Sequence, residues 1–308
     1  MTTIAPPPIP PTSPAPLPPR PERPLLGSTK VPFKERAFKG LLIFSLGVGL
    51  VTLVVLLTYI LIKGWPRLNS TLITNMPSAV LPETAGAQSA ITGTIWLMGF
   101  TALWSIPVGI LAAIYLEEYG DPRRWWNRMI EINLLNLAAV PSIVFGILGL
   151  AFISRGLGFG PTILTGSLTL ALLVLPVVVI ASREAIRAVP QSIRAGSLAL
   201  GATKWQTIWR QVLPAATPGI STGAILALSR AIGEAAPLIM LGVSFVRFNP
   251  DGLLSDFTAL PVQIYSWTSE ARPEYQVLAA AASVVLLVLL LAMNSVAIYI
   301  RNKTQKRW

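Results

Sequence analysis

The sequence predicts an all-α integral membrane protein with six transmembrane helices. Of its 308 residues 53% are hydrophobic and only 12% are charged, whereas a soluble domain carries roughly 25% charged residues. A helix needs about 20 consecutive apolar residues to cross a bilayer core. Six stretches meet that length: 40–62, 89–116, 131–153, 162–182, 218–244 and 277–300.

The six stretches differ in regularity. The first and last are uninterrupted, and the first is no signal peptide, because it is too long, follows 39 other residues and lacks a small-residue cleavage site. The third is the weakest, since Asn133, Asn136 and Pro141 interrupt it. Prolines inside the second, fourth and fifth stretches predict kinks that neighbouring helices accommodate. These prolines are Pro107, Pro176 and Pro237.

Basic residues predict the orientation. Eighteen lysines and arginines lie in the two tails and in the second and fourth connections, and five lie in the alternate connections. Because cytoplasmic loops carry the excess of Lys and Arg, both termini of this multi-pass protein are expected in the cytoplasm. The net charge of +11 therefore follows from topology, and no nucleic-acid partner is expected.

The composition excludes several kinds of chemistry. The chain has no cysteine and no histidine, so disulfides, thiolate metal sites and imidazole catalysis are excluded. Without clustered carboxylates, a membrane-bound enzyme is a weak hypothesis. We expect no catalytic residues, no metal and no cofactor.

Three regions follow from these patterns. Residues 1–39 form a proline-rich cytoplasmic tail, and 12 of the 27 prolines lie in the first 32 residues. We expect this tail to be a disordered tether, or alternatively an SH3-like ligand. A six-span membrane domain covers 40–300, and 301–308 form a basic cytoplasmic tail. Within the last external loop, the amphipathic segment 259–267 predicts either an interfacial helix or a surface for an external partner.

The loop 183–217 predicts a helical hairpin at the cytoplasmic surface. Pro190 can open a helix, and Gly201 suits the left-handed position that ends it. Thr203 and Gln206 then fit a capping box, and Pro214 is expected to end the second helix. The second helix carries an apolar stripe of Trp205, Ile208, Trp209 and Val212. The hairpin could simply pack on the chain itself; a DNA-binding role is disfavoured because both ends are tethered to spans.

This hairpin resembles the EAA loop of ABC importer permeases. That motif is Glu-Ala-Ala, three residues, Gly, nine residues, Ile, one residue and Leu-Pro; its Gly falls on Gly201 and its Leu-Pro on Leu213 and Pro214. Ala195 stands at the position of the glutamate and Gln211 at that of the isoleucine. The resemblance implies a coupling helix that docks on an ATPase through the loop 190–214, with charge from Arg194 or Lys204 in place of the glutamate. The implied coupling residues are Ala195, Gly196, Ser197, Gly201, Ala202, Lys204, Trp205, Leu213 and Pro214.

No ATPase site is expected on this chain. The phosphate loop GxxxxGK[ST] is absent, and lysine precedes serine or threonine only at Lys303-Thr304. The ATPase implied by the resemblance must therefore be a separate polypeptide.

The fifth stretch carries charge deep in the membrane. Arg230 lies 12 residues beyond Pro218, which is about 18 Å along a helix, and a charge at that depth costs roughly 2.5–3.5 kcal/mol. Glu234, four residues on, shares its face. Gly223 and Ala227 extend the same stripe, which predicts a closely packed seam or a narrow polar path. The pair either orders the helices or takes part in translocation.

The wider sequence resembles phosphate-importing ABC permeases of the PstA type. The segments that carry this are 229–237, 260–265 and 278–281, together with Trp267. The resemblance implies a type I ABC importer permease fold in the bacterial inner (plasma) membrane, and phosphate translocation by Ser229, Arg230 and Glu234. It also implies a second homologous permease in a heterodimer, a cytoplasmic ATPase dimer and an external phosphate-binding protein. A permease for another oxyanion or polar solute, and a proton-coupled secondary carrier, remain as alternatives.

Overall fold

The computed structural model describes residues 33–121, 123–243 and 245–304. The prediction for the tail at 1–32 and for the last four residues lies outside this part of the chain. The chain divides into two units, Met1–Val54 and Val55–Trp308. In the first unit the described residues form the beginning of one long helix, α1 (Phe33–Gly64), so residues 33–39, which were predicted to belong to the disordered tail, are helical instead.

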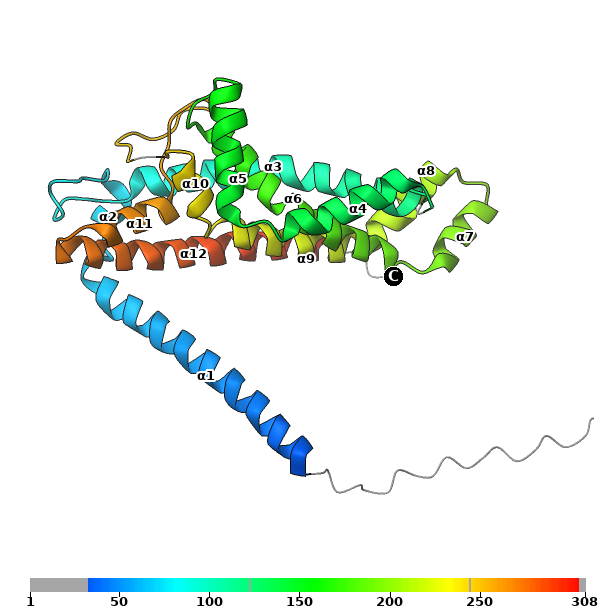
Figure 1. The fold of residues 1–308 in the computed structure, drawn as a ribbon, viewed down its shortest axis with the longest axis horizontal. Helices are drawn as coiled ribbons and strands as arrows, with labels where there is room; N and C mark the ends of the chain where they lie inside the picture. The colour runs from blue at the N-terminus through cyan, green and yellow to red at the C-terminus, as the bar shows by residue number, and fades with distance from the viewer. Residues whose placement is uncertain (1–32, 122, 244, 305–308) are drawn as a thin grey trace, which may run out of the picture. The chain divides into compact units, whose positions relative to one another are not determined.

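Helices make up nearly all of the described structure (Figure 1). They are α1 (Phe33–Gly64), α2 (Ser70–Thr74), α3 (Gln88–Ile114), α4 (Trp125–Ala138), α5 (Ser142–Leu148), α6 (Ile163–Arg187), α7 (Gln191–Ala199), α8 (Lys204–Thr207), α9 (Leu213–Ala231), α10 (Ala236–Met240), α11 (Leu260–Ser269) and α12 (Pro273–Thr304). Five helical segments of the described chain are long and apolar enough to cross a membrane, and a bent pair makes a sixth if it counts as one span. The all-α prediction is confirmed.

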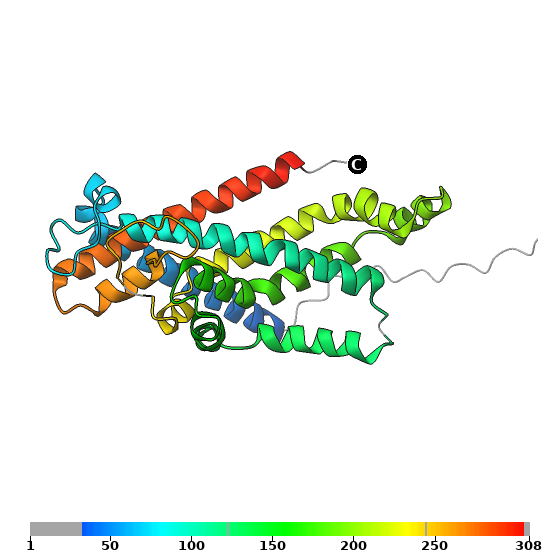
Figure 2. The same ribbon diagram turned by 90° about the horizontal axis from the view of Figure 1, so that it is seen from above.

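The core of the second unit lies around α6. The long helices α3, α6, α9 and α12 run side by side (Figures 1 and 2), and α6 is the most enclosed, with Val174, Val178 and Val179 fully buried. Both α3 and α6 continue as single helices through Pro107 and Pro176. The hairpin of α7 and α8 lies at one end of this bundle, which we call the hairpin end (Figure 1).

Small residues bring α6 and α9 close together. A Cβ added to Gly223 would lie 2.3 Å from the Cβ of Ala181, and one added to Gly219 would lie 2.6 Å from the Cβ of Ala185. Ala227, one turn beyond Gly223, is fully buried. The closely packed seam expected along this face is therefore present within the chain, between α9 and α6.

Substituting leucine for Gly223 is expected to lower the free energy of unfolding by about 1–3 kcal/mol, because the added side chain overpacks the seam. Thermal unfolding of the chain in detergent measures the change. Gly99→Leu on α3 is the matched control, since nothing lies within 4 Å of a Cβ at that position. Equal unfolding temperatures for the two variants would contradict the close contact.

The predicted third span, which Pro141 interrupts in the sequence, is sharply bent rather than a continuous helix. It forms α4 and a second arm, Ser142–Gly156, bent by 108° at the break between them. Pro141 has no N–H to continue the helix, and its ring disfavours helical geometry at the residue before it. The second arm begins as α5 and ends in a π-helical segment, Gly149–Gly156. In Figure 2 the α5 arm is seen end-on, so it stands across the long helices.

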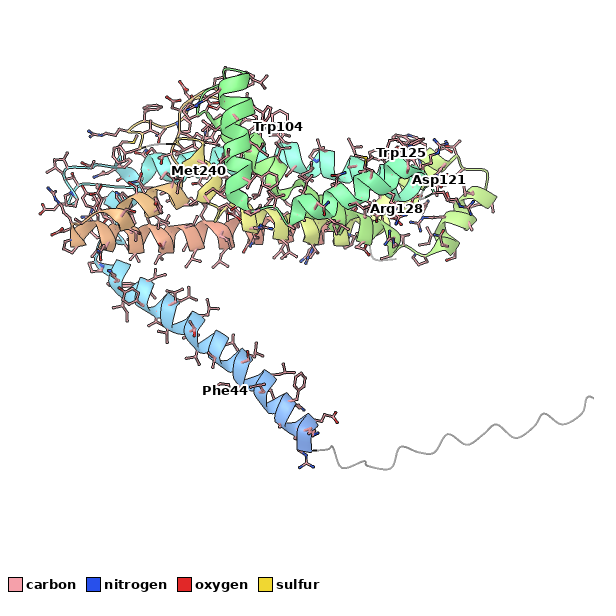
Figure 3. The ribbon with its side chains drawn as sticks, viewed as in Figure 1. Phe44, Trp104, Asp121, Trp125, Arg128 and Met240 are labelled. Carbon is pink, nitrogen blue, oxygen red and sulfur yellow. The ribbon has the colours of Figure 1, made fainter. Side chains whose placement is uncertain are left out.

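The predicted fifth span is also interrupted. Helix α9 ends at Ala231 and α10 begins at Ala236. Pro237 cannot donate to the carbonyl of Gly233 four residues earlier, and glycine itself disfavours helix, so the two residues together account for the break. The short arms of the two broken helices pack together, since a Cβ on Gly146 of α5 would lie 2.6 Å from the Cα of Pro237. Figure 3 shows Met240 of α10 beside α5.

Pro214 does not end the hairpin's second helix, contrary to the sequence-based expectation. Helix α8 continues through a π-helical turn, Ile208–Val212, into α9, and Lys204–Ala231 forms one helical segment of 28 residues. In the π-helical turn the N–H of Leu213 donates to the carbonyl of Ile208, so the usual bonding pattern is already shifted where proline enters. Pro214 then occupies the first turn of α9, where its missing N–H costs little.

The segment 259–267 is part of the core. It forms most of α11, which packs against α12, and Leu260 and Trp267 are 0% and 2% exposed. The apolar side of this segment is thus occupied by the chain itself and is not free for an external partner.

Candidate functional site

The break between α9 and α10 carries the charged pair. Arg230 lies in the last turn of α9, and Glu234 lies in the break, outside either helix. The Nε of Arg230 and the Oε1 of Glu234 are 3.4 Å apart. The expected pairing is therefore present, but the expected shared helix face is not: Gly223 and Ala227 face α6, whereas the Arg230 side chain is 48% exposed.

The exposure of Arg230 fits it for an oxyanion. Its guanidinium has five N–H donors in a plane, and the contact with Glu234 engages the Nε donor. A planar set of donors matches the oxygens of a phosphate or a similar anion. Glu234 is only 20% exposed and holds the guanidinium at the end of the helix. The arrangement can present a cation at the break while offsetting part of its cost in an apolar setting.

Ser229 faces a different neighbour. Its hydroxyl lies 2.7 Å from the carbonyl oxygen of Ile225 and 2.8 Å from Oδ1 of Asn294 on α12. The structure therefore does not bring Ser229 together with Arg230 and Glu234. The sequence interpretation did not single out Asn294. The signal that could have found it is that Asn294 is a lone amide side chain in the predominantly apolar stretch 277–300.

The hairpin has the local geometry that its sequence predicts. Gly201 has a φ of +84°, the left-handed conformation that favours glycine at a helix end. The N–H of Gln206 donates to the hydroxyl of Thr203 at 3.2 Å, and the N–H of Thr203 donates to the Gln206 side chain at 2.9 Å. Ser197 and Thr207 join the two arms through their hydroxyls, 2.9 Å apart. The predicted turn and capping box are both confirmed.

The hairpin presents an open surface of mixed polar and apolar side chains. No residue of α7 is buried, and Leu200 at the tip is 90% exposed. Ala195 and Gly196 are exposed on α7, and Trp205 is 57% exposed on the second arm. A hollow of about 600 Å³ lies between the arms, lined by Ser192, Ile193, Gly196, Ser197, Leu200, Gly201, Ala202, Gln206, Arg210 and Gln211. Leu213 and Pro214 lie deeper, at the start of α9, half-buried.

The two cations of the hairpin turn toward the chain itself. The Arg194 side chain is only 12% exposed and pairs with Glu118, which follows α3. Lys204 donates to the backbone carbonyl of Glu118, and its ammonium lies 4.8 Å from the ring centre of Tyr119. Arg194 therefore presents no free charge on the hairpin surface, and Glu118 is a residue that the sequence interpretation did not single out.

The chain is similar in sequence to permease proteins of ABC transport systems. Residues 105–306 match the model of the binding-protein-dependent transport system inner membrane component family. The chain is 35% identical over 268 residues to "Phosphate transport system permease protein PstA 1" of Mycobacterium tuberculosis (strain CDC 1551 / Oshkosh), covering 85% of this chain and 87% of that protein. It is 32% identical to "Probable ABC transporter permease protein YqgI" of Bacillus subtilis (strain 168), covering 83% and 90%.

Solved structures share the fold at low sequence identity. A chain of the MetNI methionine ABC transporter, in an inward-facing conformation, is similar with a TM-score of 0.56 at 16% identity, covering 71% of this chain and 97% of that one. A chain of a bacterial alginate ABC transporter, solved in complex with an alginate pentasaccharide-bound periplasmic protein, has a TM-score of 0.58 at 17% identity, covering 85% and 96%. These likenesses confirm the expected ABC importer permease fold.

Proposed function

Because the chain belongs to the family of binding-protein-dependent transport system inner membrane components, we propose that it is a permease subunit of an ATP-driven phosphate importer. The observation that supports an oxyanion as the substrate is the position of Arg230, which is half-exposed at a break in an otherwise apolar helix. A relative at 35% identity is named a phosphate transport permease, which supports phosphate among the oxyanions.

Arg230 and Glu234 form the proposed translocation site. When the path is empty, the carboxylate of Glu234 holds the guanidinium at 3.4 Å and lowers the cost of a charge within the membrane. An arriving phosphate replaces Glu234 as the partner of the guanidinium, since charge-assisted contacts to both anions are of similar kind. Discontinuous helices commonly form such sites near the bilayer midplane. Ser229 contributes by fixing α9 to α12 rather than by touching the substrate.

The hairpin is the proposed coupling element. We assign its exposed tip, with Leu200 90% exposed, to a groove of a separate ATPase, because this chain has no phosphate loop of its own. This assignment places the hairpin and both termini in the cytoplasm, in agreement with the distribution of basic residues. The six-span domain at 40–300 then forms half of the pathway, with the 1–39 and 301–308 tails outside it.

Three partners complete the proposed importer. A second homologous permease supplies the other half of the pathway, two ATPase subunits bind the hairpins, and an external binding protein delivers phosphate. The similarity to a transporter solved with a periplasmic protein supports the last of these.

Labelled-phosphate uptake in vesicles reconstituted with all the proposed subunits tests the function. We expect uptake that requires ATP and the binding protein, that persists with a protonophore, and that excess sulfate does not compete away. Vesicles that lack the ATPase subunits are the control. Uptake that follows the proton gradient without the ATPase would identify a secondary carrier instead, and preferential uptake of sulfate would identify a permease for another oxyanion.

A further inference from the structure

A buried ion pair joins the hairpin to the end of α3. Glu118 lies in the π-helical turn Tyr115–Tyr119 that continues α3, and its Oε1 accepts from the Nε and Nη2 of Arg194 on α7 at 3.1 and 3.0 Å. The two side chains are only 10% and 12% exposed. An ion pair this enclosed is held in one geometry, unlike a surface pair that water screens.

Both arms of the hairpin attach to this one turn. Arg194 also donates to the backbone carbonyls of Val189 at 2.5 Å and Ile186 at 2.8 Å, so it ties the start of α7 to the end of α6. From the other arm, Lys204 donates to the backbone carbonyl of Glu118. The side chain of Glu118 therefore holds the first arm, and its backbone holds the second.

The neighbouring carboxylate connects the same turn to the long helices. Glu117 accepts from Arg187 of α6 through both of its oxygens, each at 3.0 Å, and lies 3.6 Å from Arg183 of the same helix. Arg183 reaches on to Glu131 of α4 at 3.1 Å. Glu117 and Glu118 are consecutive in this π-helical turn, so their side chains point to different sides of it and serve different partners.

We propose that Glu118 is a positioning residue that transmits movement of the hairpin to α3. The covalent backbone attaches the hairpin to α6 and α9 but not to α3. When an ATPase moves α7, the movement reaches α3 only through noncovalent contacts. Replacing a buried ion pair by apolar residues often leaves stability unchanged or higher, so stability alone does not explain the pair. Its geometry instead makes the hairpin and the end of α3 one rigid piece. This inference rests on the proposed function for the identity of what moves the hairpin.

The connection itself is tested on the chain alone. Because the sequence has no cysteine, Leu200→Cys at the tip and Leu111→Cys on α3, both exposed, take two spin labels without background. Electron–electron distance measurements in nanodiscs are expected to give a narrow distribution. Glu118→Gln is expected to broaden it at least twofold, and Glu118→Asp to restore much of the narrow component. An unchanged distribution in Glu118→Gln would overturn the connection.

Asp121→Asn is the matched control for the distance measurement and for the transport measurement described next. Asp121 lies in the same connection and pairs with Arg124 at 3.9 Å, but the two side chains are 49% and 60% exposed. Figure 3 shows Asp121 at the hairpin end of the bundle. The variant removes one carboxylate charge close to Glu118 without touching the hairpin, so its distance distribution should match that of the unmodified chain.

Transmission is tested in the reconstituted importer by the number of phosphate ions taken up per ATP hydrolysed. In Glu118→Gln we expect hydrolysis within twofold of the unmodified complex and uptake per ATP at least fivefold lower, with Glu118→Asp recovering most of the ratio. A purely structural role would instead lower hydrolysis and uptake together, in proportion to the amount of complex, and would overturn the proposal. If the unmodified complex fails to transport phosphate, the proposed function is wrong. The distances between the spin labels still test, independently of transport, whether Glu118 connects the hairpin to α3.

Discussion

Replacing Arg230 by alanine is expected to reduce phosphate uptake about 100-fold or more while the complex still assembles in the membrane. Hydrogen bonds to a charged group contribute roughly 1.5–3 kcal/mol each, so losing two such contacts to phosphate, at a factor of ten per 1.4 kcal/mol, corresponds to about 100-fold or more. Arg230 is half-exposed in the last turn of α9, so we expect its loss to leave the helix packing intact. Uptake of labelled phosphate by vesicles, normalised to the amount of complex, measures the effect.

The control and the conservative variant sharpen this test. Arg128→Ala removes the same charge from an exposed position on α4, labelled in Figure 3 at the hairpin end, and should leave uptake nearly unchanged. Arg230→Lys keeps the charge but loses the planar set of donors, so we expect intermediate uptake. If Arg230→Ala imports phosphate as well as Arg128→Ala does, then Arg230 has no part in translocation.

Gly201→Val is expected to reduce ATP-driven uptake tenfold or more. Gly201 has a φ of +84°, and a side chain in this left-handed region costs roughly 1–2 kcal/mol, with more for a β-branched residue. The turn between α7 and α8 must then rearrange, which moves the tip at Leu200 away from the geometry that the ATPase contacts. The measurement is uptake alongside ATP hydrolysis in the reconstituted importer, where we expect the two to become uncoupled.

Gly158→Val is the control that distinguishes a general effect of backbone strain from a specific effect on the hairpin turn. Gly158 has a φ of +75° with nothing within 4 Å of an added Cβ, so the substitution imposes the same kind of strain. It lies in the connection between α5 and α6, away from the hairpin, and we expect uptake close to that of the unmodified complex. Equal losses in the two variants would show that strain anywhere in the fold, rather than the hairpin turn, limits transport.

Local signals in the sequence predicted the spans and the hairpin turn well. Apolar length located five helical segments that are long enough to cross a membrane, or six if the bent pair counts as one span, and Gly201, Thr203 and Gln206 adopt the conformations that their residue types favour. Such features depend on a few neighbouring residues only, so the sequence contains all that is needed to infer them.

The interruptions were harder to predict because a proline has three outcomes in this fold. Pro176 stays inside α6, Pro141 and Pro237 accompany breaks, and Pro214 enters a helix after a π-helical turn. The outcome depends on what surrounds the freed carbonyl and on the residues nearby, such as Gly233. Hydropathy does not account for either, so the sequence predicted a kink at Pro237 and an interrupted third span, but neither the 108° bend of the third nor the loss of helix in the fifth.

The candidate site was predicted in part for a related reason. The spacing of Arg230 and Glu234 was enough to predict their pairing, since the side chains meet whether or not the helix continues. The partner of Ser229 lies on α12, 65 residues away, and the partner of Arg194 lies 76 residues away. No periodicity links positions this distant, and Glu118 could be found only once the end of α3 was seen beside α7.

The π-helical turn Ile208–Val212 also sets how the hairpin and Arg230 are oriented about a common axis. A turn closed by i→i+5 bonds takes about one residue more than an α-helical turn, so a helical wheel drawn across Lys204–Ala231 is out of phase by one position after it. Losing one residue from this turn would return it to an α-helical turn and leave Arg230 at nearly the same angle to Trp205. Losing one residue from a regular α-helical part of the same segment would instead rotate the two ends by about 100° relative to each other. In aligning relatives, a gap of a single position at Ile208–Val212 is therefore compatible with an unchanged angular register between the two functional ends of one helix, while the same gap elsewhere between Trp205 and Arg230 is not.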